Sequence, residues 1–384
     1  MAVKTNYQKN GSSYYRVTAT IGKDPDGKPI RKEFYGKSKK EAEQKRDEYL
    51  QDLRLGLSSD YRDHTLGKLM RLWLFEVVKP TKADNTLVRY LGIYNTIKLS
   101  ELYNARLHDL TPLTIQKYYN NLFAEGKTAS QITMVNKVLK AFFNYCIKQR
   151  YLVISPCIGI DLPKTDKPTN AAPAVDPFTQ DEIQQILAGA TDYMPFLITL
   201  ALATGLREGE LLALTLQDVD INNRIIHVNK SLKVTYSVSS DTERSKVIKI
   251  GAPKTKSSIR DIPIPKNIIP TLKHQIFQQK NVYFKYRTAT EEQFLLSTPL
   301  GTYIDPKNLQ RRWVRLLKRT GVRYRKFHNI RHTYATRLFE ADVNIKTIQT
   351  LLGHSSLIIT EKTYVHVTKN TKTEAVDKIN HLFG

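Results

Sequence analysis

Five residues in the second half of the chain have types that suit attack on a phosphodiester. In chain order they are Arg207, His328, Arg331, His354 and Tyr364. An arginine holds phosphate oxygens well, because its planar guanidinium donates two parallel hydrogen bonds and stays charged at any working pH. A tyrosine hydroxyl is a possible nucleophile, but its pKa of about 10 requires a base or a cationic field. The set predicts a tyrosine that attacks a phosphate held by two arginines, while histidines handle protons and hydrogen bonds.

The sequence around Arg207 indicates how that side chain is presented. A Thr-Gly pair at 204–205 interrupts the apolar stretch 194–203, and Arg207 follows it. We therefore expect Arg207 at a helix start, directed into a cleft. Glu210 is three residues further on and shares its helical face, so we expect it to orient Arg207 or a nearby backbone group rather than to act as an acid or base.

Two other spacings place the remaining groups. His328 and Arg331 are three residues apart, which puts both on one face of a helix and against one phosphate. Gly353 follows an apolar helical pattern and is typical of a helix C-cap, so it is expected to turn His354 out of the helix toward the cleft.

The amino-acid composition limits the kinds of molecule that the chain is expected to bind. The chain has 384 residues, enough for two or three domains, and 60 Lys and Arg against 36 Asp and Glu give a net charge of +24. This excess favours a polyanion: DNA, RNA or an anionic membrane surface. A membrane is disfavoured because no apolar run approaches the ~20 residues that span a bilayer. The N-terminal residues do not have the pattern of a signal peptide, and the two cysteines, Cys146 and Cys157, are expected in the core rather than in a disulfide framework. The protein is therefore predicted to work in a reducing cytoplasm.

Residues 1–57 are predicted to form a small basic α+β module. Segments 14–21 and 30–35 favour strands, and a helix is expected from Ser38 to about residue 53. Its candidate DNA-binding residues are Arg16, Lys28, Arg31 and Lys32. The alternative is that these cations only make the module's surface soluble.

Residues 60–163 are predicted to form a helical domain, with Tyr118 and Tyr119 in its core and Lys137 and Lys140 outside as candidate DNA contacts. Four prolines between residues 162 and 178 predict an extended linker, placed at 164–177.

Residues 178–384 are predicted to be a mainly helical domain with a small sheet. A hairpin is expected at 219–228, and segments 247–250 and 260–264 are expected to pair as a second hairpin. Nine Lys or Arg and no acidic residue lie between 311 and 331, which favours tracking of a DNA backbone over a merely solvated face. The candidate contacts there are Arg311, Arg312, Arg325 and Lys326.

Four segments of this domain resemble the tyrosine recombinases, and within them the integrases of phages and conjugative transposons. They are 203–211 (ATGLREGEL), 328–336 (HNIRHTYAT), 351–356 (LLGHSS) and 363–367 (TYVHV). Asn329 departs from the acidic residue often found there, at a position that is not catalytic. The resemblance implies a multidomain, mainly α fold with small β-sheets, in which 1–57 binds arm-type DNA, 60–163 binds core-type DNA and 178–384 is a mixed α/β catalytic domain.

The resemblance also implies the reaction. Tyr364 would form a 3′-phosphotyrosyl link and release a 5′-hydroxyl, with a lysine on a hairpin as the general acid. Lys254 is the expected lysine and Lys256 the alternative. No cofactor or metal is expected, because the arginines supply the positive charge and the ester bond conserves the energy for religation.

The function implied is site-specific recombination through a Holliday junction by a homotetramer on double-stranded DNA, integrating and excising a mobile element. An excisionase and a host DNA-bending protein are possible partners, and the location would be the bacterial cytoplasm, at the nucleoid. An apolar stripe at residues 376, 379, 382 and 383 is expected to dock on a neighbouring protomer or in cis. The alternatives are a type IB topoisomerase, which would not exchange duplexes, and a DNA-binding regulator, which would not cleave.

Overall fold

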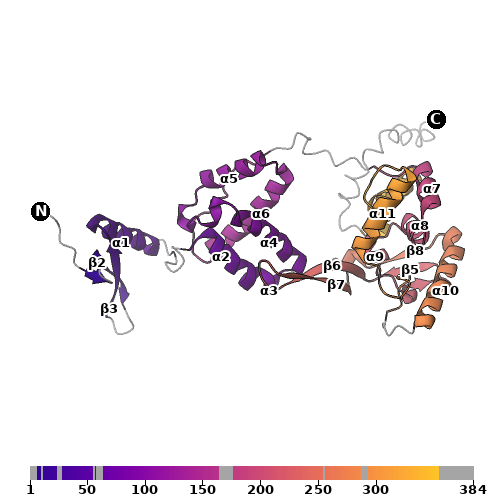
Figure 1. Ribbon diagram of the computed structural model, residues 1–384, viewed down its shortest axis with the longest axis horizontal. Coiled ribbons are helices and arrows are strands. Elements are labelled where there is room, and N and C mark those ends of the chain that lie inside the picture. Colours follow the sequence, from indigo (N-terminus) through magenta and orange to yellow (C-terminus); the bar gives the residue numbers. More distant parts are fainter. Residues whose placement is uncertain are drawn as a thin grey trace, which may run out of the picture. The chain divides into compact units, whose positions relative to one another are not determined.

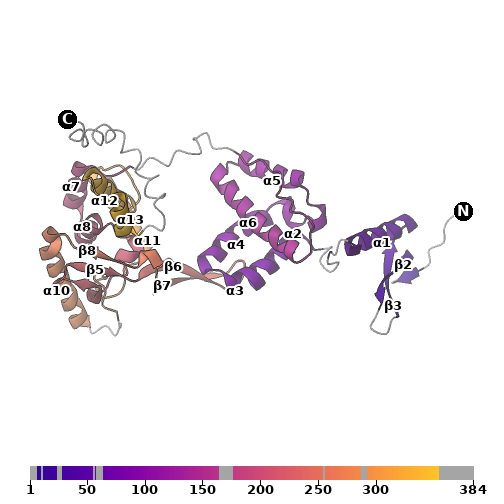
Figure 2. The same ribbon diagram turned by 180° about the vertical axis from the view of Figure 1, so that it is seen from behind.

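The computed structural model describes residues 7–9, 12–23, 28–54, 57, 64–163, 176–253, 256–286 and 292–353. The chain divides into two compact units: Met1–Pro168 with Tyr236–Ser245, and Thr169–Thr235 with Lys246–Gly384. Helices predominate, and small antiparallel sheets accompany them (Figures 1 and 2). This agrees with the fold class expected from the sequence. Within the described residues, no helix is both long and apolar enough to span a membrane.

The N-terminal module of the first unit is a three-stranded sheet with one helix. Its elements are β1 (Tyr7–Lys9), β2 (Ser12–Lys23), β3 (Pro29–Gly36) and α1 (Lys39–Arg54), and the strands are antiparallel in the order β1-β2-β3. Ser38 caps α1 by accepting a hydrogen bond from the Glu41 amide at 3.1 Å, as the sequence predicted. Phe34 of β3 packs on Tyr49 of α1, with ring centroids 5.3 Å apart.

The helical domain of the first unit surrounds its own apolar core. Its elements are α2 (Leu66–Leu72), the π-helical η2 (Trp73–Val78), α3 (Lys79–Thr81), α4 (Asp84–Lys98), the 3-10 turns η3 (Glu101–Tyr103) and η4 (Leu107–Asp109), α5 (Pro112–Ala124) and α6 (Ala129–Lys148). Thr111 and Thr128 cap α5 and α6 with their side chains. Tyr118, Tyr119 and both cysteines are buried, which confirms their predicted place in the core.

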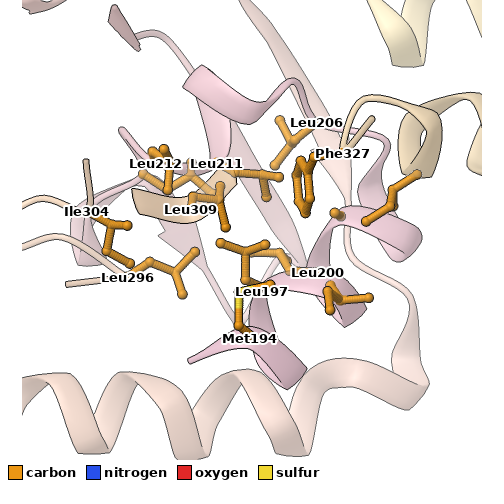
Figure 3. Packing of buried hydrophobic residues seen from close by; sticks show 14 of the residues in the cluster. Met194, Leu197, Leu200, Leu206, Leu211, Leu212, Leu296, Ile304, Leu309 and Phe327 are labelled. Carbon is orange, nitrogen blue, oxygen red and sulfur yellow. The ribbon is translucent and has the colours of Figure 1, made fainter. Parts of the chain in front are cut away.

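The second unit packs helices around a small sheet. Its helices are α7 (Gln180–Gly189), α8 (Met194–Thr204), α9 (Glu208–Leu211), α10 (Ile269–Tyr286), α11 (Pro306–Thr320), α12 (Asn329–Glu340) and α13 (Ile345–Leu352), with 3-10 turns η5 (Leu216–Asp218), η6 (Lys256–Ser258) and η7 (Lys266–Ile268). Strands β4 (Val219–Asp220), β5 (Ile225–Val228) and β8 (Arg260–Pro263) form an antiparallel sheet in the order β4-β5-β8. Figure 3 shows part of the core, where Met194 and Leu197 of α8 lie near Leu309 of α11.

The predicted pairing of segments 247–250 and 260–264 is wrong, although the hairpin at 219–228 is confirmed. Strand β7 (Arg244–Gly251) pairs with β6 (Ser231–Val238), and β8 pairs instead with β5. The fully buried Ile262 of β8 lies opposite the fully buried Ile226 of β5. Strand alternation shows which residues face inward, but the partner of a strand depends on which apolar faces meet in the core.

Candidate active site

Arg207 is held where α8 ends. Gly205 adopts a left-handed conformation (φ 61°) after α8, and a Cβ atom there would lie 2.2 Å from the ring of Tyr334 on α12. Only glycine allows both this turn and this contact. Arg207 is then the N-cap of α9, and its side chain is 34% exposed. This is the helix start expected from the sequence.

Glu210 orients Arg207, as its spacing predicted. The carboxylate is 2% exposed and accepts a hydrogen bond from the Arg207 backbone amide at 2.9 Å. Its second oxygen accepts from Nη1 of Arg207 at 2.8 Å. The same carboxylate also binds Arg260 of β8, at 3.0 Å from Nη2. Burial alone would raise the pKa of Glu210, but its contacts with Arg260 and Arg207 outweigh burial and lower the pKa below its usual value. Glu210 is therefore an anion that fixes two guanidinium groups.

Arg331 lies on the first turn of α12, and α12 packs against α8 and α13 (Figure 2). It is only 3% exposed. Its Nη1 donates to the Gly205 carbonyl at 2.8 Å and its Nη2 donates to the Leu352 carbonyl at 2.5 Å. A single guanidinium therefore joins the end of α8 to the end of α13.

The last turn of α13 receives three arginines on three successive carbonyls. Leu351 accepts from Nε of Arg260 at 2.6 Å, Leu352 accepts from Arg331, and Gly353 accepts from Nη2 of Arg207 at 2.9 Å. The final carbonyls of a helix have no partner within the helix and carry the negative end of its dipole, so cations stabilise them. We call this arrangement the α13 carbonyl cluster. It brings the two predicted phosphate-binding arginines to one place, directly before residue 354 in the chain.

Gly353 ends α13 as the predicted C-cap, with φ 63°. A Cβ atom there would lie 2.8 Å from the Ser257 carbonyl oxygen and 3.1 Å from Nη1 of Arg260. We expect Gly353→Ala to lower the melting temperature. The positive φ alone costs about 1–2 kcal/mol, and the clash adds to it.

Gly321 provides the matched control for Gly353, because it has φ 71° but a Cβ atom added there would meet nothing within 4 Å. Gly321→Ala carries the same backbone penalty without the clash. Thermal unfolding should therefore show a larger decrease in melting temperature for Gly353→Ala than for Gly321→Ala. Equal falls would mean that the close approach to Ser257 and Arg260 is unimportant.

His328 stands at the N-terminus of α12, beside the arginines. Its ring packs edge-to-face on His332, with centroids 4.9 Å apart. Although part of the residue remains exposed, desolvation lowers the pKa of His328 to about 4, and the charges of His332, Arg331 and Arg207 act in the same direction. Neutral His328 can donate or accept one hydrogen bond at pH 7 without adding charge.

We expect the His328 imidazole of the free protein to titrate near pH 4 in an NMR experiment, where its signal is identified by its loss in His328→Gln. The folded pKa lies below the unfolded value of 6.5, so the unfolded chain binds more protons between these pH values and stability falls as pH drops from 6.5 toward 4. This fall should be smaller in His328→Gln. A midpoint near 6.5 in the folded protein would contradict the described surroundings of His328.

The structure brings Arg207, His328 and Arg331 together and does not describe the other predicted catalytic residues. Lys254, His354 and Tyr364 lie outside the described residues, and only the backbone of Lys256 is described, at the start of η6. With β7 and β8 in different sheets, the connection that contains Lys254 is not the tip of a hairpin between them.

Sequence reasoning missed Arg260. An arginine in a strongly basic chain is usually a solvated charge, yet this one is 9% exposed. Strand alternation could have indicated its burial, because Arg260 lies on the same side of the strand as Ile262 and Ile264, and all three are buried.

The predicted DNA-binding residues differ in their surroundings. Eight of them are exposed: Arg16, Lys28, Arg31, Lys137, Lys140, Arg311, Arg312 and Lys326. Lys32 is half-buried and lies over the Tyr49 ring. Arg325 is 8% exposed in its side chain and is bound by Glu182 and Asp176, each at 2.8 Å. Because its charge is already satisfied inside the protein, we leave Arg325 out of the proposed DNA surface.

Comparisons with known proteins show which family the chain belongs to. The model of the phage integrase family matches residues 177–371, and that of the phage integrase N-terminal SAM-like domain matches residues 65–123. A tyrosine recombinase XerC-like protein of Caldanaerobacter subterraneus subsp. tengcongensis is 45% identical over 392 residues, which cover 100% of both chains. The prophage integrase IntR of Escherichia coli K12 is 23% identical, over 82% of this chain and 79% of its own.

Solved structures share the fold. The Tn1549 transposon integrase, in complex with a circular intermediate DNA, superposes with a TM-score of 0.67 and 22% identity, covering 82% of this chain and 99% of that chain. A lambda integrase dimer bound to a core site gives a TM-score of 0.54 and 18% identity, with 93% of each chain covered. The chain therefore belongs to the phage integrase family of tyrosine recombinases, enzymes that cleave and rejoin DNA with a tyrosine nucleophile.

Proposed function

We propose that the chain is a site-specific recombinase that integrates and excises a mobile element, through a 3′-phosphotyrosyl intermediate and a Holliday junction. The observation that carries the proposal is the meeting of Arg207 and Arg331 at the end of α13, directly before His354, with His328 close to both arginines. The sheet of the N-terminal module supports an integrase that reads arm sites as well as core sites. The transposon and phage integrases with the same fold, known in complexes with DNA, favour the same interpretation.

The scissile phosphate would be held first by Arg207, which is 34% exposed. Arg331 is 3% exposed, so it would have to turn an Nη group away from the Gly205 or Leu352 carbonyl to bind the same phosphate. Arg207 donates two of its five guanidinium N–H groups, to Glu210 and to the Gly353 carbonyl. The other three remain as donors for phosphate oxygens. Tyr364 would give its hydroxyl proton to a nearby histidine as its oxygen bonds to phosphorus, and the bond to the 5′-oxygen would break as Lys254 gives that oxygen a proton. Religation would reverse both steps. The arginines act mainly on the charge of the transition state, where fixed donors in a partly dehydrated site are most effective.

A nicked duplex that carries a candidate attachment site tests the proposal. Cleavage near the nick releases a short fragment, so religation fails and the covalent protein–DNA adduct accumulates on a denaturing gel. We expect the adduct in EDTA and without ATP, together with recombinant products when two intact sites are supplied. Tight binding to attachment DNA without any adduct would support the non-cleaving regulator instead.

Two alternatives within the enzyme class remain separable in the same assay. A type IB topoisomerase would relax supercoiled DNA but would not exchange strands between two duplexes. A recombinase acting at a fixed chromosomal site, which the similarity to a XerC-like protein also allows, would recombine two core sites without arm DNA. The proposed integrase would require arm sites on one of its substrates.

Helix α11 offers a test of the DNA-binding surface. Gln310 of α11 hydrogen-bonds with Glu208, the neighbour of Arg207, which marks the side of α11 that is nearest to the site. Arg311 and Lys318 are exposed and, seven residues apart, share one face next to that side. Arg312 points elsewhere, since it pairs with Asp192 at 2.6 Å and lies over the Tyr193 ring. We infer that Arg311 contacts a DNA phosphate and that Arg312 does not.

Arg311→Gln should weaken binding at every DNA sequence and reduce the slope of log affinity against log salt by about 1. Arg312→Gln, the adjacent change of the same chemistry, should leave the slope unchanged. Binding titrations by fluorescence anisotropy at several salt concentrations measure both. If Arg312→Gln alters the slope more than Arg311→Gln, the assigned face of α11 is wrong.

A further inference from the structure

Arg260 is a buried cation next to the candidate site. It lies on β8, opposite Val228 of β5, which fixes its backbone in the sheet. Nε donates to the Leu351 carbonyl at 2.6 Å, Nη2 donates to Glu210 at 3.0 Å, and Nη1 donates to the Ser258 carbonyl at 3.0 Å and to Glu210 at 3.3 Å. All three nitrogens of the guanidinium are therefore bound to the protein itself.

The acceptors of Arg260 belong to three segments that converge on the site. Glu210 holds Arg207 on α9, and Leu351 lies in the last turn of α13, two residues before Gly353. Ser258 is in η6, at the end of the connection that contains Lys254 and Lys256. With a side chain 5% exposed, Arg260 cannot reach a DNA phosphate without leaving these partners. Its position suits the alignment of other residues.

We propose that Arg260 is a positioning residue for DNA cleavage, which holds the Lys254-bearing connection and the end of α13 in register with Arg207. This rests on the proposed function, because it assigns Arg260 a part in the same reaction. It makes no contact with DNA: its effect passes through Glu210 to Arg207, and through Ser258 to the connection before β8.

Arginine is required for this role because its acceptors diverge. One planar fork reaches a carboxylate and two carbonyls, whereas the ammonium group of lysine is a point charge that cannot bind all three in the same geometry. The backbone of Gly353 lies close to this guanidinium, since a Cβ at Gly353 would approach Nη1 of Arg260 to 3.1 Å. A change that preserves the charge of Arg260 should therefore still disturb the alignment.

Single-turnover cleavage of the nicked duplex by the full chain separates alignment from folding. The amplitude of the covalent adduct counts the active molecules, and the rate at saturating protein reports the chemical step. We expect Arg260→Lys to keep the amplitude and the affinity for DNA but to cleave more slowly, on the order of 10²-fold, as expected for a misplacement near 1 Å. Arg260→Met should be slower still, because it leaves Glu210 with one guanidinium partner.

Arg325→Lys is the matched control. Arg325 is also a buried arginine bound by carboxylates in the same unit, but these carboxylates, Asp176 and Glu182, are not part of the candidate site. This variant should have a lower melting temperature and the wild-type cleavage rate. If Arg260→Lys merely behaves like Arg325→Lys, with a normal rate or a reduced amplitude only, Arg260 is structural and the proposal fails.

A substrate with sulfur in place of the bridging 5′-oxygen identifies the displaced segment. Attack by the tyrosine oxygen forms the O–P bond while the P–S bond breaks, and sulfur leaves with the electron pair as a thiolate that needs no proton. Arg260→Lys should therefore regain part of its lost rate on this substrate, because the Lys254-bearing connection no longer matters while the alignment of Arg207 through Glu210 still does. Absence of this recovery overturns the proposed alignment of the general acid. Failure of the wild-type chain to form any adduct would instead reject the proposed function.

Discussion

Tyr364→Phe is expected to form no covalent adduct with nicked attachment DNA while binding that DNA as tightly as the unchanged chain. The substitution removes only the phenol oxygen, which is the atom that would bond to phosphorus. Arg207 and Arg331, the residues proposed to bind phosphate, remain in place on the end of α13, so we expect the DNA backbone to be held as before. Denaturing gels measure the adduct, and electrophoretic shifts of the same mixtures measure binding.

Tyr334→Phe is the control for this experiment. Among the described tyrosines, Tyr334 lies near both Arg260 and Arg331, and burial raises its pKa, which makes it a poor nucleophile. It should therefore retain adduct formation, although its ring packs against Gly205. Persistence of the adduct in Tyr364→Phe, or its loss only in Tyr334→Phe, would show that the nucleophile has been assigned to the wrong residue.

Arg331→Lys should reduce the cleavage rate at saturating DNA by roughly 10²–10³-fold, the range seen when one donor to a developing negative charge is removed. Lysine cannot donate along two fixed directions, so the contacts with Gly205 and Leu352 and the grip on phosphate cannot all be kept. The loss should appear mainly in the rate rather than in the affinity, because we propose that other, exposed cations also bind the DNA backbone.

Arg337→Lys tests the same change elsewhere on α12. Arg337 is exposed and pairs with Glu340 at 2.7 Å, and exposed ion pairs contribute about 0–1 kcal/mol. Its cleavage rate should match that of the unchanged chain. Equal rates for Arg331→Lys and the unchanged chain would remove Arg331 from the proposed chemistry.

Local rules predicted the local structure well. The C-cap at Gly353, the cap at Ser38, the helix start at Arg207 and the orienting role of Glu210 depend on residues within a few positions of one another, and the structure has them. The partner of β7 was predicted wrongly because pairing is decided by the core and not by the strand itself.

The surroundings of buried cations were the other failure. Arg260 and Arg325 look alike in sequence to the exposed Arg311, yet each is enclosed by carboxylates or carbonyls that lie far away in the chain. Glu210 is 50 residues from Arg260, and Leu351 is 91 residues from it. The acceptors of a buried guanidinium are oxygen atoms that the tertiary fold brings together. A count of charged residues in the sequence therefore cannot distinguish an arginine that binds DNA from one that stabilises the protein.

The α13 carbonyl cluster has a consequence for how this family member tolerates sequence change. All three acceptors are main-chain atoms, and every residue type supplies the same carbonyl. The side chains of the last turn can therefore vary under two conditions. Position 352 must keep an apolar side chain that fills the core, and position 353 must remain glycine. The amino-acid sequence of the last turn of α13 can thus change without loss of these hydrogen bonds, whereas the three arginines that donate them must remain arginines.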